Sequence, residues 1–398
     1  MNDDSIGNLG KKGDLHEHEM IIDNEHAITM NDFVVVKHWM KPYDDILCKV
    51  MDIKYDGHFK ARLNPMTELS MPFMQGAKVF KASPEMVMGA LDINEKPDRI
   101  NIGKLRGFGI PVWIDTNCFL RHVSVLGTTG SGKTYTTAVL LEELARLNIT
   151  SIVVDKKGDF INLPEVCDNV RVIKLVDRVP EYDEMYAGGK ITIINASGVE
   201  EERLKVLVHL ILNRIWSNKT LDKPLMVILD EAHLYAPQGK GKGEGVARKV
   251  NLFASEGRGH GLGLIVITQR PAKISKDVLA QCNFNICLGI RDNNDLTPVV
   301  TSTPGLSNKD KDMLQHLGVG QAVIYGGNIK VPLIININPR KSIEEAPVKL
   351  IDIKRQDTMD IELEGVTIED DEPLVLKPYN YVTTTNIREI ESDDMMRR

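Results

Sequence analysis

The sequence predicts an α/β fold with a mostly parallel sheet, preceded by a small all-β barrel domain and followed by a charged C-terminal arm. Three observations support this. Apolar strands alternate with helical patterns from about residue 119 to 340, which is typical of parallel sheets. Short β-rich pieces separated by turn residues precede that region. A glycine-rich loop, "GTTGSGKT", directly follows a strand and opens a helix.

Changes in sequence texture predict four segments. Residues 1–28 are polar and are expected to be partly disordered. The range 29–118 contains "FVVVKHW", "ILCKVMDIKY" and "AKVFKA", which indicate the β-barrel domain. The range 119–340 is the α/β domain, and its helical patterns include "EEERLKVLVHLILNRIW". The charged range 341–398 is expected to be an arm or tail.

Composition restricts the classes of function. The chain has 398 residues, 42% of them hydrophobic, and a net charge of −7, which argues against a surface coated with DNA-binding cations. No apolar run approaches the ~20 residues that cross a bilayer, and the polar start resembles no signal peptide. Five scattered cysteines without CxxC pairs indicate reduced core residues. We therefore expect a cytoplasmic protein without a membrane segment.

The loop that follows "HVSVL" fits the phosphate-binding pattern G-x-x-x-x-G-K-[ST]. Its glycines allow backbone N–H groups to approach phosphates, Lys133 adds a full charge, and Thr134 offers a hydroxyl to Mg²⁺. The predicted ATP-binding residues of this loop are Gly127, Thr128, Thr129, Gly130, Ser131, Gly132, Lys133, Thr134 and Tyr135. The α/β region is therefore predicted to be a P-loop nucleotide-binding domain, with ATP and Mg²⁺ as cofactors.

Two carboxylates end the apolar strand in "LMVILDEAHLYAP". Asp230 is the candidate Mg²⁺ partner, and Glu231 can polarise the water that attacks the γ-phosphate; alternatively, both could cap the next helix. Consecutive Asp and Glu favour a RecA-like ATPase over a small GTPase. Gln269 ends the strand of "LGLIVITQRP" and could contact the γ-phosphate or only loop carbonyls.

Arg258 lies between glycines in "SEGRGHG". An arginine there could reach the ATP of a neighbouring subunit as an arginine finger, or it could be an ordinary solvated side chain. With Lys133, Glu231 and Gln269 it completes the set of catalytic candidates.

These motifs together resemble the HerA branch of the HerA/FtsK superfamily. The resemblance runs from about residue 100 to 337 through "RHVSVLGTTGSGKTYT", "VVDKKGDF", "ILDEAHLYAP", "SEGRGHGLGLIVITQRPAKISKDVLAQCN" and "GQAVIYGGNIKVPLIININ". It implies that Arg258 acts in trans, that Gln269 is a sensor, that Arg121 acts in cis at the nucleotide and that Asp155 closes the second strand beside it. The β-rich module corresponds to the family's HAS barrel. "DKKGDF" departs from the usual "DPHGEY", and the insert "QGKGKGEG" makes the alignment there uncertain.

Membership of that family implies a homohexameric ring that encircles double-stranded DNA and moves along it with ATP. The expected partners are a NurA-like nuclease in DNA end processing, or a sirtuin-like or nuclease effector in antiviral defence. Cations are needed only where phosphates pass. The candidates for DNA contact are Lys156, Lys157, Lys240, Lys242, Arg248 and Lys249.

Other functions stay open at this stage. A ring ATPase that remodels a protein partner would share the same ATP-site residues, and the charge of −7 slightly favours it. A nucleotide-binding scaffold of a defence complex is a further alternative, although it has no use for a water-activating glutamate. "DEAH" also suggests a DEAH-box helicase, but nothing after residue 340 could build the second RecA-like domain which that class requires.

Overall fold

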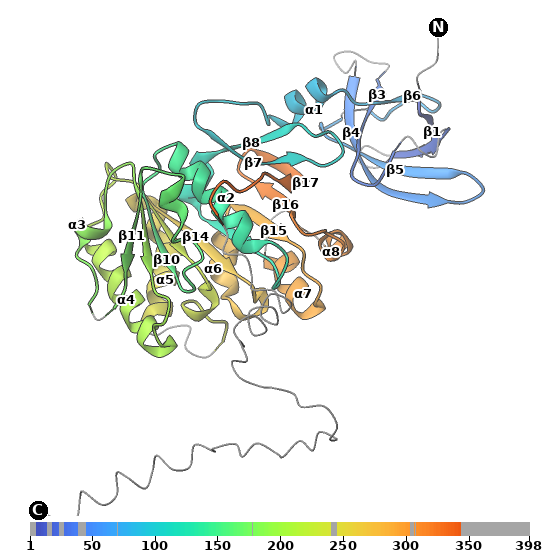
Figure 1. Ribbon diagram of the computed structural model, residues 1–398. Coiled ribbons are helices and arrows are strands. Elements are labelled where there is room, and N and C mark those ends of the chain that lie inside the picture. The colour runs from blue at the N-terminus through green and yellow to red at the C-terminus, as the bar shows by residue number, and fades with distance from the viewer. Residues whose placement is uncertain are drawn as a thin grey trace, which may run out of the picture. The chain divides into compact units, whose positions relative to one another are not determined.

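The computed structural model describes residues 5–13, 18–23, 28–38, 45–69, 71–176, 178–239, 245–302, 306 and 308–343. They form a closed N-terminal barrel and a large sheet flanked by helices, as predicted (Figure 1). The expected arm lies outside the described residues from 344 onward. Among the helices of the described ranges, we find none with the length and apolar character needed to span a bilayer.

Within the described residues, six strands close the barrel in the order β1-β2-β5-β4-β3-β6. They are β1 (Gly7–Gly13), β2 (His18–Ile22), β3 (Phe33–Lys37), β4 (Asp45–Tyr55), β5 (Phe59–Pro65) and β6 (Lys78–Lys81). Alternate residues of these strands point inward. Val34, Val50 and Leu63 are fully buried there and form part of the barrel's own apolar core.

The large sheet has eleven strands in the described part of the chain, in the order β11-β12-β10-β13-β14-β9-β15-β16-β17-β7-β8. They are β7 (Arg99–Leu105), β8 (Pro111–Asp115), β9 (Val123–Leu126), β10 (Ser151–Asp155), β11 (Val170–Lys174), β12 (Ile191–Asn195), β13 (Leu225–Leu229), β14 (Leu262–Thr268), β15 (Phe284–Leu288), β16 (Gln321–Gly326) and β17 (Ile329–Ile337). The strands from β11 to β15 in this order are parallel, and the rest are antiparallel. The sheet is therefore mostly parallel, as predicted.

The strands of the barrel differ from the expected boundaries of 1–28 and 29–118. β1 and β2 lie before residue 29, in the segment that we expected to be partly disordered. β1 is rich in glycine and lysine, but it pairs with both β2 and β6 and so completes the closed barrel. At the other end, β7 pairs with β17, so β7 and β8 extend the large sheet instead of the barrel. Backbone pairing, and not composition, decides both assignments.

Helices cover both faces of the large sheet (Figure 1). The helices are α1 (Pro84–Leu91), α2 (Lys133–Arg146), α3 (Tyr182–Met185), α4 (Glu201–Ser217), α5 (Gly245–Glu256), α6 (Lys276–Gln281), α7 (Asn293–Ser302) and α8 (Lys311–Gln315). Val153 contributes to the core shared with α2, whereas its neighbours Ile152 and Val154 contribute to the core shared with α4 to α7. The central strands are apolar throughout because both of their faces are buried. All five cysteines are free, and four are buried.

Strand order brings four loops to one edge of the sheet. β10, β13, β14 and β9 are parallel neighbours, so their carboxyl ends meet at the same edge. β14 lies between β13 and β9 and therefore places Gln269 between the Asp230–Glu231 pair and the glycine-rich loop. The amino ends of the same strands meet at the opposite edge.

Candidate active site

The glycine-rich loop connects β9 to α2 and is tightly closed. Gly132, immediately before α2, has a φ of 92°, a conformation that side chains other than glycine rarely adopt. A Cβ atom at Gly127 would lie 2.6 Å from Ser131 Oγ. Ser131 Oγ donates a hydrogen bond to the Thr128 carbonyl at 2.7 Å. The loop and the amino end of α2 thus form a cradle suited to an anion.

A pocket of about 700 Å³ opens beside this cradle, a volume suited to a small ligand such as a nucleotide. The predicted loop residues that line it are Thr128, Thr129, Gly130, Gly132, Lys133, Thr134 and Tyr135. Lys133 is only 7% exposed, and the Tyr135 hydroxyl accepts a hydrogen bond from the Arg340 backbone N–H at 2.7 Å. Gly127 and Ser131 belong to the loop but do not line this pocket. We call this space the nucleotide pocket.

Asp230 follows β13 directly, and its carboxylate is almost completely buried. Its Oδ2 has no hydrogen-bond partner among the described residues. Burial raises the pKa of Asp230 to about 7, although Lys133 opposes the shift. A buried oxygen without a protein partner suits a hard cation such as Mg²⁺ or its bound water. No group of three or more His, Cys, Asp or Glu side chains in the described ranges could hold a metal, so the cation would need phosphate ligands as well.

Glu231 is held in an unusual backbone conformation, with a φ of 51°. Only 2% of the residue is exposed. Burial favours the neutral carboxyl, but Lys157 and Lys133 outweigh burial, so the pKa of Glu231 is lowered and the side chain stays ionised. Its Oε2 has no hydrogen-bond partner within the described residues. An ionised carboxylate with one unoccupied oxygen has the chemistry of a general base.

Gln269 connects Glu231 to the glycine-rich loop. Its Nε2 donates to Glu231 Oε1 at 2.7 Å, and its Oε1 accepts from Thr129 Oγ1 at 2.9 Å. Gln269 also lines the nucleotide pocket. The structure therefore brings Lys133, Glu231 and Gln269 together, and Gln269 bonds side chains rather than loop carbonyls.

Asp155 organises the loop after β10 and does not line the nucleotide pocket. Its buried carboxylate accepts hydrogen bonds from the backbone N–H groups of residues 157–160 at 2.8–3.2 Å. This loop carries Asp159, whose Oδ2 accepts from Thr134 Oγ1 at 3.4 Å. It also carries Lys157, whose Nζ lies 2.7 Å from Glu231 Oε1. Asp155 thus acts on the nucleotide pocket through its loop.

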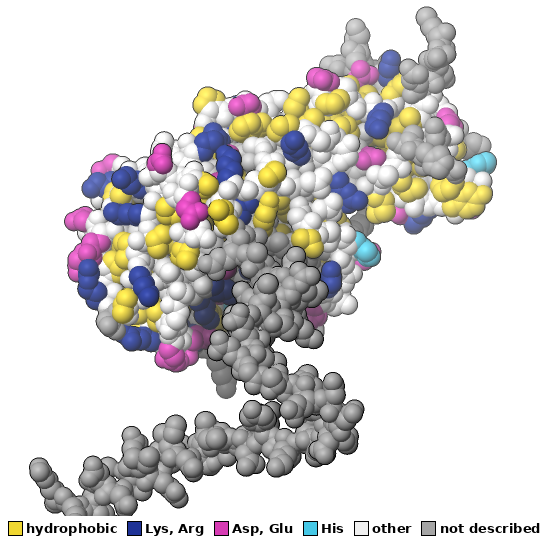
Figure 2. Space-filling view, viewed as in Figure 1, with side chains coloured by type: hydrophobic (Ala, Val, Ile, Leu, Met, Phe, Trp, Pro, Cys, Tyr) yellow, Lys and Arg dark blue, Asp and Glu magenta, His cyan; other side chains and the backbone are white. Residues whose placement is uncertain are grey.

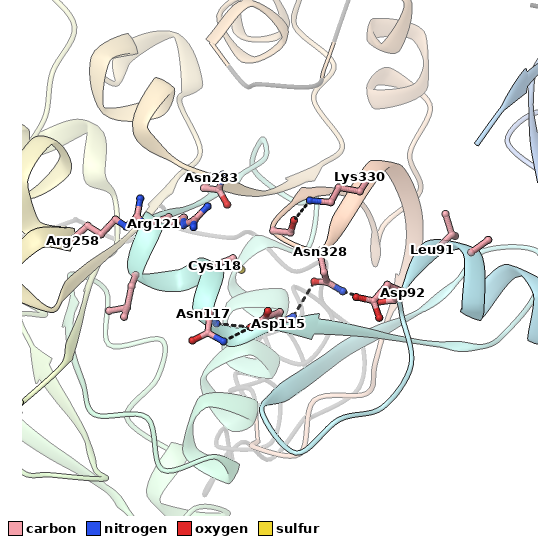
Figure 3. A pocket seen from close by; sticks show the side chains of 13 residues that line it. Leu91, Asp92, Asp115, Asn117, Cys118, Arg121, Arg258, Asn283, Asn328 and Lys330 are labelled. Carbon is pink, nitrogen blue, oxygen red and sulfur yellow. Dashed lines mark hydrogen bonds between the residues drawn. The ribbon is translucent and has the colours of Figure 1, made fainter. Parts of the chain in front are cut away.

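Arg258 and Arg121 line a different pocket, also of about 700 Å³, together with Asn283 and Lys330 (Figure 3). Arg121 directly precedes His122 and β9, and Arg258 lies in the turn before β14, so both are at the amino edge of the sheet. The structure thus places Arg121 away from the nucleotide pocket of its own subunit, and its expected role at the nucleotide stays a prediction. The cause is the direction of β9, which separates Arg121 from the glycine-rich loop.

His122, which the sequence analysis did not single out, ties the two arginine-bearing segments together. It is buried with a φ of 65°, and its Nδ1 accepts a hydrogen bond from the Leu264 N–H at 3.0 Å. Burial, with a smaller contribution from Arg258, lowers the pKa of His122 to about 4 against an opposing hydrogen bond to the Ala254 backbone. The ring is therefore neutral and can accept this bond. In the sequence, His122 stands between Arg121 and the apolar run of β9, and this position was the only sign that it has a structural role.

Four of the six candidate DNA contacts lie within the described residues. Lys157 is engaged by Glu231, and Lys156 Nζ lies 3.6 Å from Glu201 Oε2. Lys240 and Lys242 lie outside the described residues. Arg248 and Lys249 are on α5, where the Lys249 ammonium lies 5.7 Å from the centre of the Trp216 ring. The four described candidates thus lie in two places, the loop after β10 and α5, and their contact with DNA stays a prediction.

A smaller pocket of about 430 Å³ adjoins the nucleotide pocket and is rich in cations. Lys157 and Gln269 line both pockets, and Arg270 and Lys273 add exposed positive charge to the smaller one. Burial lowers the pKa of His233 in its wall; Glu231 opposes this shift, whereas Arg270, Lys156 and Lys273 add to it. Sequence reasoning missed Arg270 and Lys273, although "TQRPAK" places both just after Gln269. We call this space the basic pocket.

A glycine-rich phosphate cradle beside a buried lysine, two carboxylates and a strand-end glutamine defines a P-loop ATPase. Family models described as "Helicase HerA, central domain" and "Helicase HerA-like C-terminal" match residues 100–181 and 206–338. Together they cover more than half of the chain, which belongs to the HerA family. The protein is an ATP hydrolase of that type.

Individual relatives agree with this assignment. The DNA double-strand break repair helicase HerA of Sulfolobus acidocaldarius is 23% identical over 76% of this chain and 79% of its own. The probable DNA double-strand break repair helicase HerA of Methanocaldococcus jannaschii is 24% identical over 61% of this chain and 76% of its own. Among solved structures, VirB4 of Thermoanaerobacter pseudethanolicus is 13% identical over 63% of this chain and 98% of its own, with a TM-score of 0.48. The genome packaging NTPase B204 of Sulfolobus turreted icosahedral virus 2, in complex with AMPPCP, is 18% identical over 55% of this chain and 97% of its own, with a TM-score of 0.40.

Proposed function

We propose that the protein forms a homohexameric ring that moves along double-stranded DNA as it hydrolyses ATP. DNA as the partner is supported by the relatives, which are DNA double-strand break repair helicases. We further propose a NurA-like nuclease or another effector as the second subunit, in DNA end processing or antiviral defence. The position of Arg258 carries the proposal of a ring.

In this proposal each residue of the ATP site has one task. Lys133 holds the phosphates, and Glu231 polarises the attacking water. Thr134 and Asp230 would hold Mg²⁺, which neutralises charge on the phosphates when it is bound. Gln269 fixes the position of the Glu231 carboxylate relative to the glycine-rich loop through its two hydrogen bonds.

Arg258 cannot reach the nucleotide pocket of its own subunit. It precedes β14, whereas Gln269 follows β14, and seven strand residues span about 20 Å. An exposed arginine at the amino edge can instead meet the nucleotide of a neighbouring subunit if the subunits associate head to tail. Such heterologous contacts form a ring when the rotation from one subunit to the next closes. Arg121 lines the same pocket and would face the same neighbour.

Surface charge supports local rather than general contact with DNA. On the face shown in Figure 2, the coloured Lys and Arg side chains are interspersed with Asp and Glu, and neither sign dominates. The basic pocket is the local exception, with Arg270, Lys273 and Lys156 beside the ATP site. We propose that these three cations contact DNA phosphates, in place of the wider set of lysines predicted from the sequence.

The test is complementation between two inactive variants. Arg258→Ala should bind ATP but hydrolyse it about a thousandfold more slowly, because a cation that stabilises the transition state is lost. Lys133→Ala should not hydrolyse ATP. An equal mixture should recover up to about a quarter of the wild-type rate, because one interface in four joins an intact phosphate cradle to an intact arginine.

Subunit exchange must be shown separately by co-purification of differently tagged chains. Arg178→Ala is the matched control, since it removes an arginine that is 70% exposed and pairs with Glu184; it should keep the wild-type rate. If exchange is complete and the mixture stays inactive, Arg258 does not act between subunits. Duplex DNA that fails to stimulate the wild-type ATPase would favour a protein as the moved partner.

A further inference from the structure

The loop after β10 places a lysine on the catalytic carboxylate. Lys157 Nζ lies 2.7 Å from Glu231 Oε1, and the Lys157 side chain is 45% exposed whereas that of Glu231 is 2% exposed. The Lys157 backbone N–H is bonded to Asp155, so the loop is held independently of this side chain. The ammonium can therefore move while its backbone stays in place.

Lys157 and Gln269 lie between Glu231 and the nucleotide pocket. Both line the nucleotide pocket and the basic pocket, whereas Glu231 lines only the basic pocket. Both also engage Glu231 Oε1. Glu231 Oε1 thus already has two donors, and each of them competes with a water proton for that oxygen.

The γ-phosphate of ATP would bring new negative charge to the side of the pocket lined by Lys133, Thr134 and Lys157. An exposed ammonium exchanges a carboxylate for a phosphate at little cost, because one charge-assisted contact replaces another. ADP lacks this group and leaves the ion pair intact. We propose that Lys157 binds the γ-phosphate of ATP and in doing so releases Glu231 to activate the attacking water.

This inference rests on ATP hydrolysis by the chain and is independent of the DNA partner. It makes Lys157 a cis-acting cation in addition to Lys133. Arg258 of a neighbouring subunit would then add a third positive charge near the transferred phosphoryl group. Glu231 Oε1 becomes a better acceptor for the water proton once Lys157 has moved to the γ-phosphate, so ATP binding and water activation are coupled.

The experiment measures the affinities of the wild type and variants for fluorescent ATPγS and ADP, without DNA. Lys157→Ala should bind ATPγS about tenfold to a hundredfold more weakly, the loss expected for one charged contact, and keep its ADP affinity. Lys157→Arg should retain the preference for ATPγS because the charge is kept. Glu231→Gln should bind ATPγS about threefold more tightly, because Lys157 then has no competing partner.

Lys190→Ala is the control, since it removes an exposed lysine at the amino end of β12 and should leave both affinities unchanged. Circular dichroism and thermal unfolding establish that each variant is folded. Equal loss of ATPγS and ADP affinity in Lys157→Ala would overturn the proposal, because the lysine would then only maintain the pocket. Unchanged affinity for both, with faster hydrolysis, would overturn it as well, because the lysine would then only restrain Glu231.

Discussion

Asp230→Asn should remove a pH-dependent cost to the stability of the nucleotide-free protein. Asp230 is 3% exposed, and burial raises its pKa from 3.8 to about 7. The folded state therefore keeps a proton that the unfolded state has released, and stability falls as the pH rises from the lower value to the higher one. Above about pH 7 the cost is complete and amounts to at most about 4 kcal/mol, at 1.36 kcal/mol per pKa unit.

The measurable quantity is the difference between two pH values. Between about pH 5.5 and about pH 8.5 this carboxyl should cost the wild type about 2 kcal/mol of unfolding free energy, and the asparagine variant should not lose this amount. Any cost of burying the amide is the same at both pH values and cancels. The assay is urea unfolding, followed by circular dichroism, in EDTA and without nucleotide.

Asp222→Asn removes an exposed carboxylate and serves as the control. Its unfolding free energy should depend on pH as that of the wild type does. Mg²⁺ with ATPγS should then stabilise the wild type more than Asp230→Asn, because a ligand stabilises the state that binds it. Identical pH dependence in the wild type and Asp230→Asn would refute the reasoning that a proton is held at this site.

Two further predictions concern the ATP site and the basic pocket. Lys133→Ala should lose nucleotide binding and turnover together, whereas Glu231→Gln should keep binding and lose turnover; nucleotide titration and phosphate release measure the two. Replacing Arg270 and Lys273 with Ala should weaken binding to unrelated duplexes similarly and reduce the slope of log affinity against log salt by about two.

The charge-matched control for the second prediction is Lys174→Ala combined with Lys190→Ala, which removes two exposed lysines outside the basic pocket. Its salt slope should equal that of the wild type. An unchanged slope in the Arg270 and Lys273 variant would move the DNA surface elsewhere, and wild-type turnover in Glu231→Gln would remove Glu231 from catalysis.

Local features of this protein could be predicted from the sequence. The phosphate cradle is contained in eight consecutive residues, and its glycines, Lys133 and Thr134 have the predicted positions because neighbours in sequence determine them. The same holds for the central strands, whose continuous apolar runs reflect burial on both faces. Asp230 and Glu231 also follow directly from their place at the end of β13.

Features that depend on pairing or strand direction could not be predicted. β1 has the composition of a loop and is a strand only because β2 and β6 bond it on both sides. The role of Lys157 depends on β10 and β13 being neighbours, which puts the loop after one strand beside the carboxylates after the other. The sequence alone placed Lys157 among the candidates for DNA contact.

The position of Arg121 reveals how the two edges of the sheet are related. β9 and β14 are parallel neighbours, and each has an arginine before it and a nucleotide-site residue after it. Arg121 and the glycine-rich loop flank β9, while Arg258 and Gln269 flank β14. In the proposed ring, the arginines that meet a neighbour's ATP are thus joined to their own subunit's pocket by two short, fully buried strands. A change at one edge can be passed to the other only if these strands move as a unit, and the His122–Leu264 hydrogen bond holds them together at the arginine end.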